Sequence, residues 1–152
     1  MSIEVSNEST VSIELDIFRS LATFVLDQMK IHPAVDLGIV FVDEEPMSDL
    51  HVRWLDEAGP TDVLSFPMDE LRPGSDLLTA PEGILGDVVI CPQVAMRQAE
   101  AAGHTAQDEM LLLLTHGMLH LMGYDHAEPE EEREMFGLQQ QLLVKFAEAG
   151  NA

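Results

Sequence analysis

Cysteine and positive charge are both scarce in this chain. It has one cysteine, Cys91, and only seven Lys and Arg residues against 28 Asp and Glu residues, which gives a net charge of −21. A single thiol excludes an internal disulfide bond and fits a reducing compartment. The negative charge argues against a general nucleic-acid-binding surface, because a negatively charged surface repels phosphates. A polyanionic substrate would therefore need the few cations to gather at the site, or a bound metal ion to attract it.

Long hydrophobic runs are also missing. The best apolar run, Met110–Leu114, is followed by Thr115 and His116, far short of the roughly 20 residues that cross a bilayer. The segment Met1–Glu4 has no basic stretch followed by an apolar one, so no signal peptide is visible. We therefore expect a cytoplasmic protein that does not enter a membrane.

The hydrophobic fraction of 46% over 152 residues is enough for the core of one domain. No linker or repeat divides the chain, so we expect a single domain over residues 1–152. Strands interleaved with helices predict an α/β fold, in which a small mixed sheet packs against helices. Apolar periodicity predicts strands at 1–5, 37–42, 62–66 and 84–90, helices at about 11–32, 47–55, 92–102, 106–122 and 130–149, and a long loop at 68–83.

The ends and faces of these helices can also be predicted. Ser9 or Thr10 is expected to cap the first helix, because a hydroxyl can bind the free backbone N–H groups there. Thr105 and Asp108 are expected to do the same for the fourth helix, which is apolar all round and so should be central and buried. The segment 43–46 is expected to turn the chain before the second helix. The inner face of that helix would carry Met47, Leu50, Trp54 and Leu55.

The segment with the most chemical information is His116-Gly-Met-Leu-His120-Leu-Met-Gly-Tyr-Asp-His126. Side chains four residues apart lie on one face of a helix, so His116 and His120 can bind the same ion. Gly123 can adopt a positive φ, end the helix and reverse the chain, which would bring His126 to the same place. Three of the six histidines fall in this segment, which favours a metal site over separate core histidines.

Three protein ligands leave one tetrahedral position open, which is typical of catalytic rather than structural zinc. Imidazole ligands favour zinc, although other transition metals also bind them. Zinc lowers the pKa of a bound water molecule to about 7 and polarises carbonyl or phosphoryl oxygens. The spacing therefore predicts one zinc ion per chain and a hydrolytic reaction.

The residue after the first histidine separates peptide hydrolysis from other hydrolytic reactions. The histidine spacing matches that of metzincin proteases, which have a glutamate at that position. Here it is Gly117, which cannot act as a general base. The absence of a glutamate counts against a protease. RNA cleavage can instead use the 2′-hydroxyl or an activated water molecule without that glutamate.

At the histidine segment the chain resembles the YbeY family of bacterial endoribonucleases and ribosomal-RNA maturation factors. Pro60-Thr-Asp-Val-Leu-Ser-Phe-Pro67 and Leu85-Gly-Asp-Val-Val-Ile-Cys-Pro92 also agree with that family, so the resemblance covers nearly the whole chain. It implies a single-domain α/β metalloprotein, similar in fold to a reduced metzincin, whose central helix carries the first two histidines. The zinc ligands would be His116, His120 and His126.

The resemblance further implies a single-strand-specific endoribonuclease that matures the 3′ end of 16S ribosomal RNA and takes part in ribosome quality control. Its partners would be ribosomal RNA and the small ribosomal subunit, with no DNA and no membrane. Two other functions stay open. One is a metallopeptidase or other metal-dependent hydrolase, and the other is a non-catalytic ribosome-assembly factor with a structural zinc.

One departure from the family concerns an arginine. The family often has an arginine that is important for activity shortly before its Pro-Thr stretch. The aligned residue here is Leu55, and Arg53 lies on another side of the expected helix. We therefore assign no catalytic residue. If RNA is the substrate, Arg53, Arg72 and Arg97 are expected to gather near the zinc site.

The sequence leaves two alternatives for Asp87 and for Asp125, and it also bears on the three other histidines. Asp87 interrupts an apolar strand and should either bond to a nearby backbone group or face the site. Asp125 should either orient a histidine ligand or lie exposed in the turn. His32 and His104 are expected at the surface, whereas the sequence leaves the role of His51 open.

Overall fold

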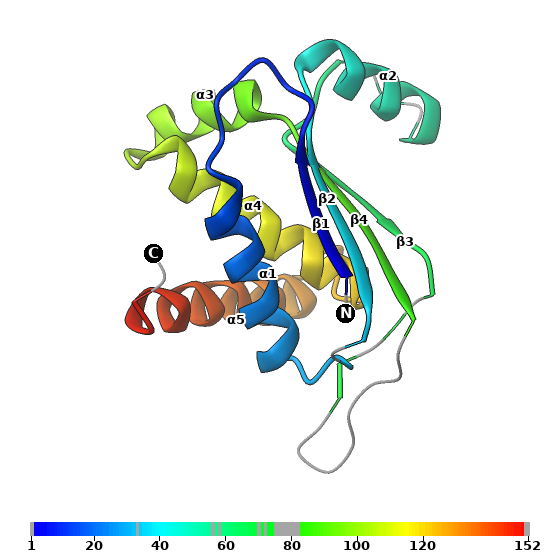
Figure 1. The fold of residues 1–152 in the computed structure, drawn as a ribbon, viewed down its shortest axis with the longest axis vertical. Coiled ribbons are helices and arrows are strands. Elements are labelled where there is room, and N and C mark those ends of the chain that lie inside the picture. Colours follow the sequence, from blue (N-terminus) through cyan, green and yellow to red (C-terminus); the bar gives the residue numbers. More distant parts are fainter. Residues whose placement is uncertain are drawn as a thin grey trace.

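Four strands form one mixed sheet in the computed structural model, which describes residues 2–32, 34–55, 57, 59–69, 71, 73–74 and 83–150. The strands are β1 (Ser2–Asn7), β2 (Asp36–Phe41), β3 (Val63–Pro67) and β4 (Ile84–Ile90), in the spatial order β1-β2-β4-β3. β1, β2 and β4 run parallel, and β3 runs antiparallel to β4. The antiparallel strand β3 therefore forms one edge of the sheet (Figure 1).

The described helices are α1 (Leu15–Gln28), α2 (Glu44–Leu55), α3 (Pro92–Ala102), α4 (Ala106–Leu121) and α5 (Pro129–Glu148). Figure 1 shows α1, α3, α4 and α5 on one side of the sheet, with α2 apart from them at one end. The main core lies between those four helices and the sheet and includes Phe18, Ile39, Leu85, Leu114 and Phe146. The predicted α/β fold, a small mixed sheet packed against helices in one domain, is confirmed.

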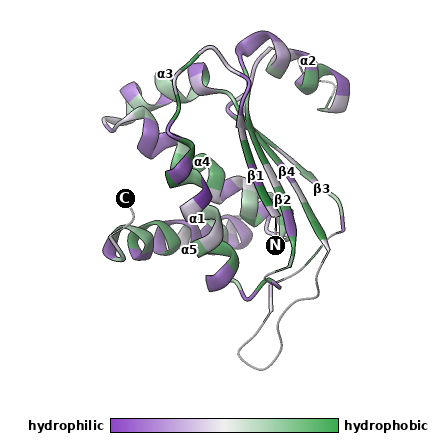
Figure 2. Ribbon diagram, in the orientation of Figure 1, coloured by the Kyte–Doolittle hydropathy of each residue, from purple (hydrophilic) through white to green (hydrophobic). Residues whose placement is uncertain are grey.

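Side chains alternate between the two faces of the sheet, so a second, smaller core forms on the face away from α4. Met47 of α2 is at its centre, together with Leu64 and Val89. In Figure 2 the strands are mostly hydrophobic, whereas the helices combine hydrophobic and hydrophilic sides. Within the described residues, no helix combines the length and the apolar character needed to span a membrane.

The central helix α4 contacts α1, α3, α5, β3 and β4, as its apolar surface predicts. It packs closely on the sheet at Gly117, where the Ser65 hydroxyl of β3 donates a hydrogen bond to the Gly117 carbonyl at 3.1 Å. A Cβ atom at position 117 would lie 2.8 Å from Cγ1 of Val88. Close packing at this point therefore depends on glycine, and it holds the following turns of α4 beside the edge strand.

The start of α1 differs from the prediction. The helix begins at Leu15, after an N-cap residue, Glu14, whose side chain makes no cap hydrogen bond. Ser9 instead bonds through its hydroxyl to the Asn7 side chain at 2.6 Å, and Thr10 bonds to the Asp43 side chain at 3.1 Å. The capping prediction was wrong because these hydroxyls stabilise the turn after β1 rather than a helix end. The prediction for α4 is confirmed for Thr105, whose side chain accepts a hydrogen bond from the Asp108 N–H at 3.0 Å.

The second helix differs from its prediction in where it begins and in how exposed its last turn is. α2 begins at Glu44, so Glu44–Pro46 form its first turn rather than a separate chain turn. Met47 is buried as expected, but Trp54 and Leu55 are 62% and 53% exposed. The expected inner face was wrong at these two residues, because the last turn of α2 lies beyond the apolar cluster that Met47 joins. The long loop expected at 68–83 lies mostly outside the described residues.

Candidate metal centre

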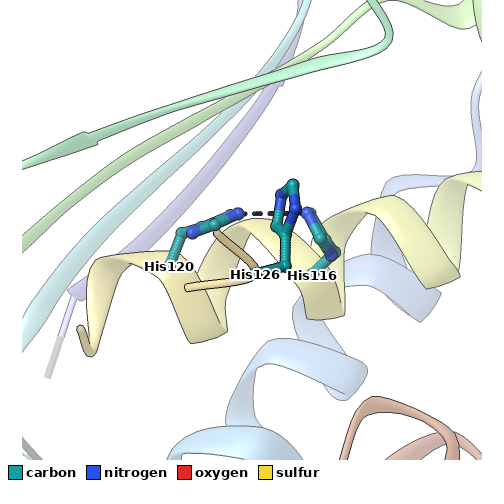
Figure 3. Close-up of side chains that lie close together, drawn as sticks. All are labelled: His116, His120 and His126. Atoms are coloured by element: carbon teal, nitrogen blue, oxygen red, sulfur yellow. Dashed lines mark hydrogen bonds between the residues drawn. The ribbon is translucent and has the colours of Figure 1, made fainter. Parts of the chain in front are cut away.

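The three histidines of the sequence motif converge beside the edge strand. His116 and His120 project from consecutive turns of α4, as their spacing predicts. The helix ends after Leu121, and Gly123, with φ of 97°, turns the chain back toward it. His126 then joins the other two, and one potential ligand atom from each residue lies within 4.8 Å of the others (Figure 3). We call these three residues the histidine cluster.

Hydrogen bonds fix the ring orientation of the two helical histidines. Nδ1 of His116 lies 2.9 Å from the side-chain oxygen of Gln139, and Nδ1 of His120 lies 2.9 Å from the backbone oxygen of Tyr124. Both oxygens only accept hydrogen bonds, so each Nδ1 carries the proton. The two Nε2 atoms of the neutral rings therefore carry lone pairs, and they face each other at 3.1 Å. Two lone pairs at this distance repel each other unless a proton or a metal cation lies between them, so the cluster could hold a metal ion.

The protonation equilibria also suit metal binding. Burial lowers the pKa of His116 below its ordinary value, although its bond to Gln139 acts in the opposite direction. Burial lowers the pKa of His120 as well, against the effect of its bond to the Tyr124 carbonyl. Neutral imidazole is the form that binds metals, so little proton release opposes binding at neutral pH.

The third histidine is held less firmly than the other two. His126 is exposed, with its ring centroid 5.4 Å from that of His116 and 5.2 Å from that of His120. Asp125 accepts a hydrogen bond from the His126 backbone N–H at 2.7 Å and does not bond to a histidine ring. Of its two expected roles, Asp125 therefore has that of an exposed turn residue.

Gln139 is the polar partner that the sequence interpretation missed. It lies on α5, 23 residues after His116, and its side chain is buried. Its position belongs to the inner face of α5, between the buried residues Met135 and Leu142. A single polar residue in that apolar stripe was the available signal, but only the folded structure shows which group it contacts.

A cavity of about 860 Å³ contains the histidine cluster. It is lined by the end of α2, the whole of β3, one side of α4, and Phe136 and Gln139 of α5. Two carboxylates, Asp62 and Glu109, also line it. Asp62 accepts a hydrogen bond from the Val63 N–H at 2.7 Å, and Glu109 is paired with His104. Both acids are thus already engaged with neighbouring groups.

Positive side chains are missing from the described lining of this cavity. Arg97 instead pairs with Glu44 at 2.9 Å. Arg53 does not line the cavity, because the last turn of α2 directs the neighbouring Trp54 and Leu55 toward it. The expectation that three arginines gather at the site is therefore wrong for Arg53 and Arg97, and Arg72 lies outside the described residues.

The remaining polar residues lie away from the histidine cluster. Asp87 is exposed on β4, where it faces Gly38 of the neighbouring strand, and it does not line the cavity. His51 is buried and bonds to the Gly59 carbonyl and the Glu57 carboxylate, both at 2.9 Å. These histidine contacts stabilise the end of α2 and the turn that leads to β3.

The likeness to known proteins covers almost the entire chain. A sequence model described as endoribonuclease YbeY matches residues 3–147. Proteins named endoribonuclease YbeY are similar to it: one from Thermobifida fusca (strain YX) is 64% identical over 144 residues, covering 95% of this chain and 93% of that protein. Another, from Beutenbergia cavernae, is 62% identical over 146 residues, covering 96% of this chain and 97% of that protein.

A solved structure agrees with the sequence relatives. The solution structure of TM1509 from Thermotoga maritima matches with a TM-score of 0.63 and 26% identity, over 96% of this chain and 90% of that one. The family resemblance noted from the sequence motifs is thus confirmed. The chain belongs to the endoribonuclease YbeY family.

Proposed function

We propose that residues 1–152 form one metal-dependent endoribonuclease domain that cuts single-stranded RNA at the histidine cluster. The observation that carries this proposal is the pair of imidazole Nε2 atoms that face each other at 3.1 Å while both Nδ1 atoms are engaged elsewhere. A cation bound by the cluster resolves the repulsion between these lone pairs. The names of the similar proteins supply the reaction class.

Zinc is the proposed metal, with His116, His120 and His126 as its ligands. Three imidazole nitrogens suit zinc and leave one tetrahedral position open. The ion would supply Lewis-acid polarisation of a phosphoryl oxygen of the phosphate that is cleaved. The protein contributes the orientation of the rings through Gln139 and the Tyr124 carbonyl, which keep both Nε2 atoms available.

The position of Gly117 supports RNA rather than peptide as the substrate. A protease of this motif needs a glutamate there, but a side chain at position 117 would run into Val88 and Ser65. RNA carries its own nucleophile, the 2′-hydroxyl, so cleavage depends less on a protein base. The same argument makes DNA a poor substrate.

The proposed cellular role is maturation of the 3′ end of 16S ribosomal RNA and ribosome quality control, with the small ribosomal subunit as partner and the cytoplasm as location. Support for this role comes from the family rather than from a feature of the cavity. Among the described residues, no lysine or arginine lines the cavity. The RNA must therefore bind there without help from cationic side chains of this lining.

Metal-dependent RNA cleavage is the direct test of this function. The purified, zinc-loaded chain should cut labelled single-stranded 16S ribosomal RNA fragments, and a chelator should abolish cleavage. Casein and single-stranded DNA of the same sequence should stay intact. Cleavage that persists after complete metal removal, or hydrolysis of casein alone, would contradict the proposal. Intact RNA in the presence of bound metal would instead favour a non-catalytic assembly factor.

Gln139 offers a test of the metal centre that does not depend on activity. Replacing Gln139 with leucine removes the acceptor for the His116 ring at similar side-chain size. We expect zinc affinity to fall by about 10- to 100-fold, measured by competition with a chelating dye. Gln139→Glu keeps an acceptor and should retain affinity, and Gln140→Leu, on the exposed side of α5, is the matched control. Unchanged affinity in Gln139→Leu would remove Gln139 from the metal centre.

A further inference from the structure

Aromatic side chains are rare in this chain but gather at the cavity. Phe, Trp and Tyr make up 5% of the residues, yet Trp54, Phe66 and Phe136 all line the same cavity. Trp54, which is the only tryptophan, is 62% exposed. The neighbouring Leu55, also in the lining, is 53% exposed, so the two side chains form an apolar patch of the kind that marks a ligand-binding surface.

Trp54 and Phe66 are arranged as a pair. Their ring centroids lie 6.2 Å apart with an interplanar angle of 70°, so the rings meet edge to face. Trp54 comes from the last turn of α2 and Phe66 from the edge strand β3, where Phe66 packs against the small core on the sheet face away from α4. The cavity therefore extends around the edge strand from this pair to the histidine cluster. The edge-to-face contact fixes the orientation of the indole, and the high exposure of Trp54 leaves indole surface open to a flat ligand.

The charge of the cavity decides between a phosphate group and a base as the group bound here. Apart from the three histidines that would hold the metal ion, the charged residues of the described lining are Asp62 and Glu109, so a phosphate away from the ion would meet negative charge. A nucleic-acid base is uncharged and has flat apolar faces that stack on aromatic side chains. The cavity of about 860 Å³ is near the upper end of the roughly 300–1,000 Å³ typical of ligand pockets.

We propose that Trp54, supported by Phe66, stacks an unpaired RNA base and so positions the strand for cleavage at the histidine cluster. This inference rests on the proposed endoribonuclease function and names the feature of the substrate that the site recognises. A base inside a duplex has both faces covered by its neighbours and cannot stack on the indole. The aromatic pair therefore selects single-stranded RNA without reading its sequence or relying on cationic side chains.

The fluorescence of Trp54 measures this contact directly, because no other tryptophan contributes. The zinc-loaded full chain is titrated with a short 2′-O-methyl oligoadenylate, which has no free 2′-hydroxyl to attack the neighbouring phosphate. Stacking of an adenine should quench the emission. An abasic oligomer of the same length, which keeps the phosphates and sugars, should not quench it. Equal quenching by both oligomers would overturn the stacking site.

Variants separate stacking from other effects. Trp54→Ala should weaken binding of a labelled oligoadenylate by about 5- to 150-fold in an anisotropy assay, the range expected for one lost base stack. Trp54→Phe should retain most of the affinity because it keeps an aromatic face. Val52→Ala, on the same helix and exposed but outside the cavity, is the control and should bind normally. Zinc content and thermal unfolding confirm that each variant is folded and loaded.

The outcomes distinguish this inference from the proposed function. Metal-dependent cleavage together with unchanged affinity in Trp54→Ala would overturn the stacking site alone. Failure of the unaltered protein to bind or cleave single-stranded RNA would overturn both. Salt gives an independent readout, since stacking releases few counterions. The logarithm of the affinity should fall with the logarithm of salt concentration with a slope shallower than about −1, and a slope of several units would show that phosphate contacts dominate.

Discussion

Replacing His120 with alanine is expected to remove zinc from the protein and to lower kcat/KM for single-stranded RNA by at least about 100-fold. His120 contributes one of the two Nε2 atoms that face each other at 3.1 Å, so its loss leaves too few ligands to hold the ion firmly. His116→Ala should behave in the same way. Metal content by mass spectrometry and initial rates on labelled RNA measure the two effects separately.

A matched control for the histidine variants is available in the same chain. His32 lies between α1 and β2, where its Nδ1 accepts a hydrogen bond from the Ala34 N–H at 2.9 Å, and it does not line the cavity. His32→Ala should therefore retain both zinc and activity. The assignment of the ligands fails if His120→Ala keeps a full zinc ion per chain, whatever its activity.

Gly117→Glu is expected to prevent stable folding rather than to create a peptidase. This change restores the residue that a protease has after its first histidine. The new side chain would start 2.8 Å from Val88 and 3.1 Å from the Ser65 hydroxyl, where α4 packs closely on the sheet. Overpacking and an unpaired buried carboxylate together should lower the free energy of unfolding by at least about 4 kcal/mol. Urea unfolding followed by circular dichroism measures the loss.

A smaller substitution at position 117 and a glycine substitution elsewhere serve as comparisons for Gly117→Glu. Gly117→Ala should cost about 1–3 kcal/mol, because Val88 is buried and branched and cannot move aside easily. Gly137, on α5, is the matched control, since an added Cβ atom would meet open space there. Gly137→Ala should be neutral or stabilising by up to about 1 kcal/mol, as expected for glycine in a helix. A Gly117→Glu protein as stable as the parent, or one that hydrolyses casein, would contradict our interpretation.

The sequence predicted the parts of the site that depend on local geometry. The spacing of His116 and His120 requires only a helix, and Gly123 requires only a residue that tolerates positive φ. The identification of these residues as a cluster needed no knowledge of the tertiary structure. The alternation of strands and helices was likewise enough to predict the mixed sheet with its helical layer.

Sequence periodicity could not predict contacts between residues that lie far apart in the sequence. Gln139 contacts His116 across the packing of α5 on α4, and nothing in the spacing of the two residues indicates this. Trp54 and Leu55 have the helical phase of Met47 but lie past the small core that buries it, so periodicity placed them in the interior. Ser9 and Thr10 have the chemistry of helix caps, but a turn and the Asp43 side chain compete for their hydroxyls.

The different locations of the three histidines bear on how long a metal ion stays bound. His116 and His120 lie on α4, which packs against α1, α3, α5, β3 and β4, and such a helix opens only when the whole domain unfolds. His126 lies exposed in the short connection between α4 and α5, a kind of segment that opens locally at little energetic cost. If the cluster holds the ion as proposed, opening of this connection releases one ligand while the fold stays intact. The lifetime of the bound metal is then set by a few surface residues rather than by the stability of the domain.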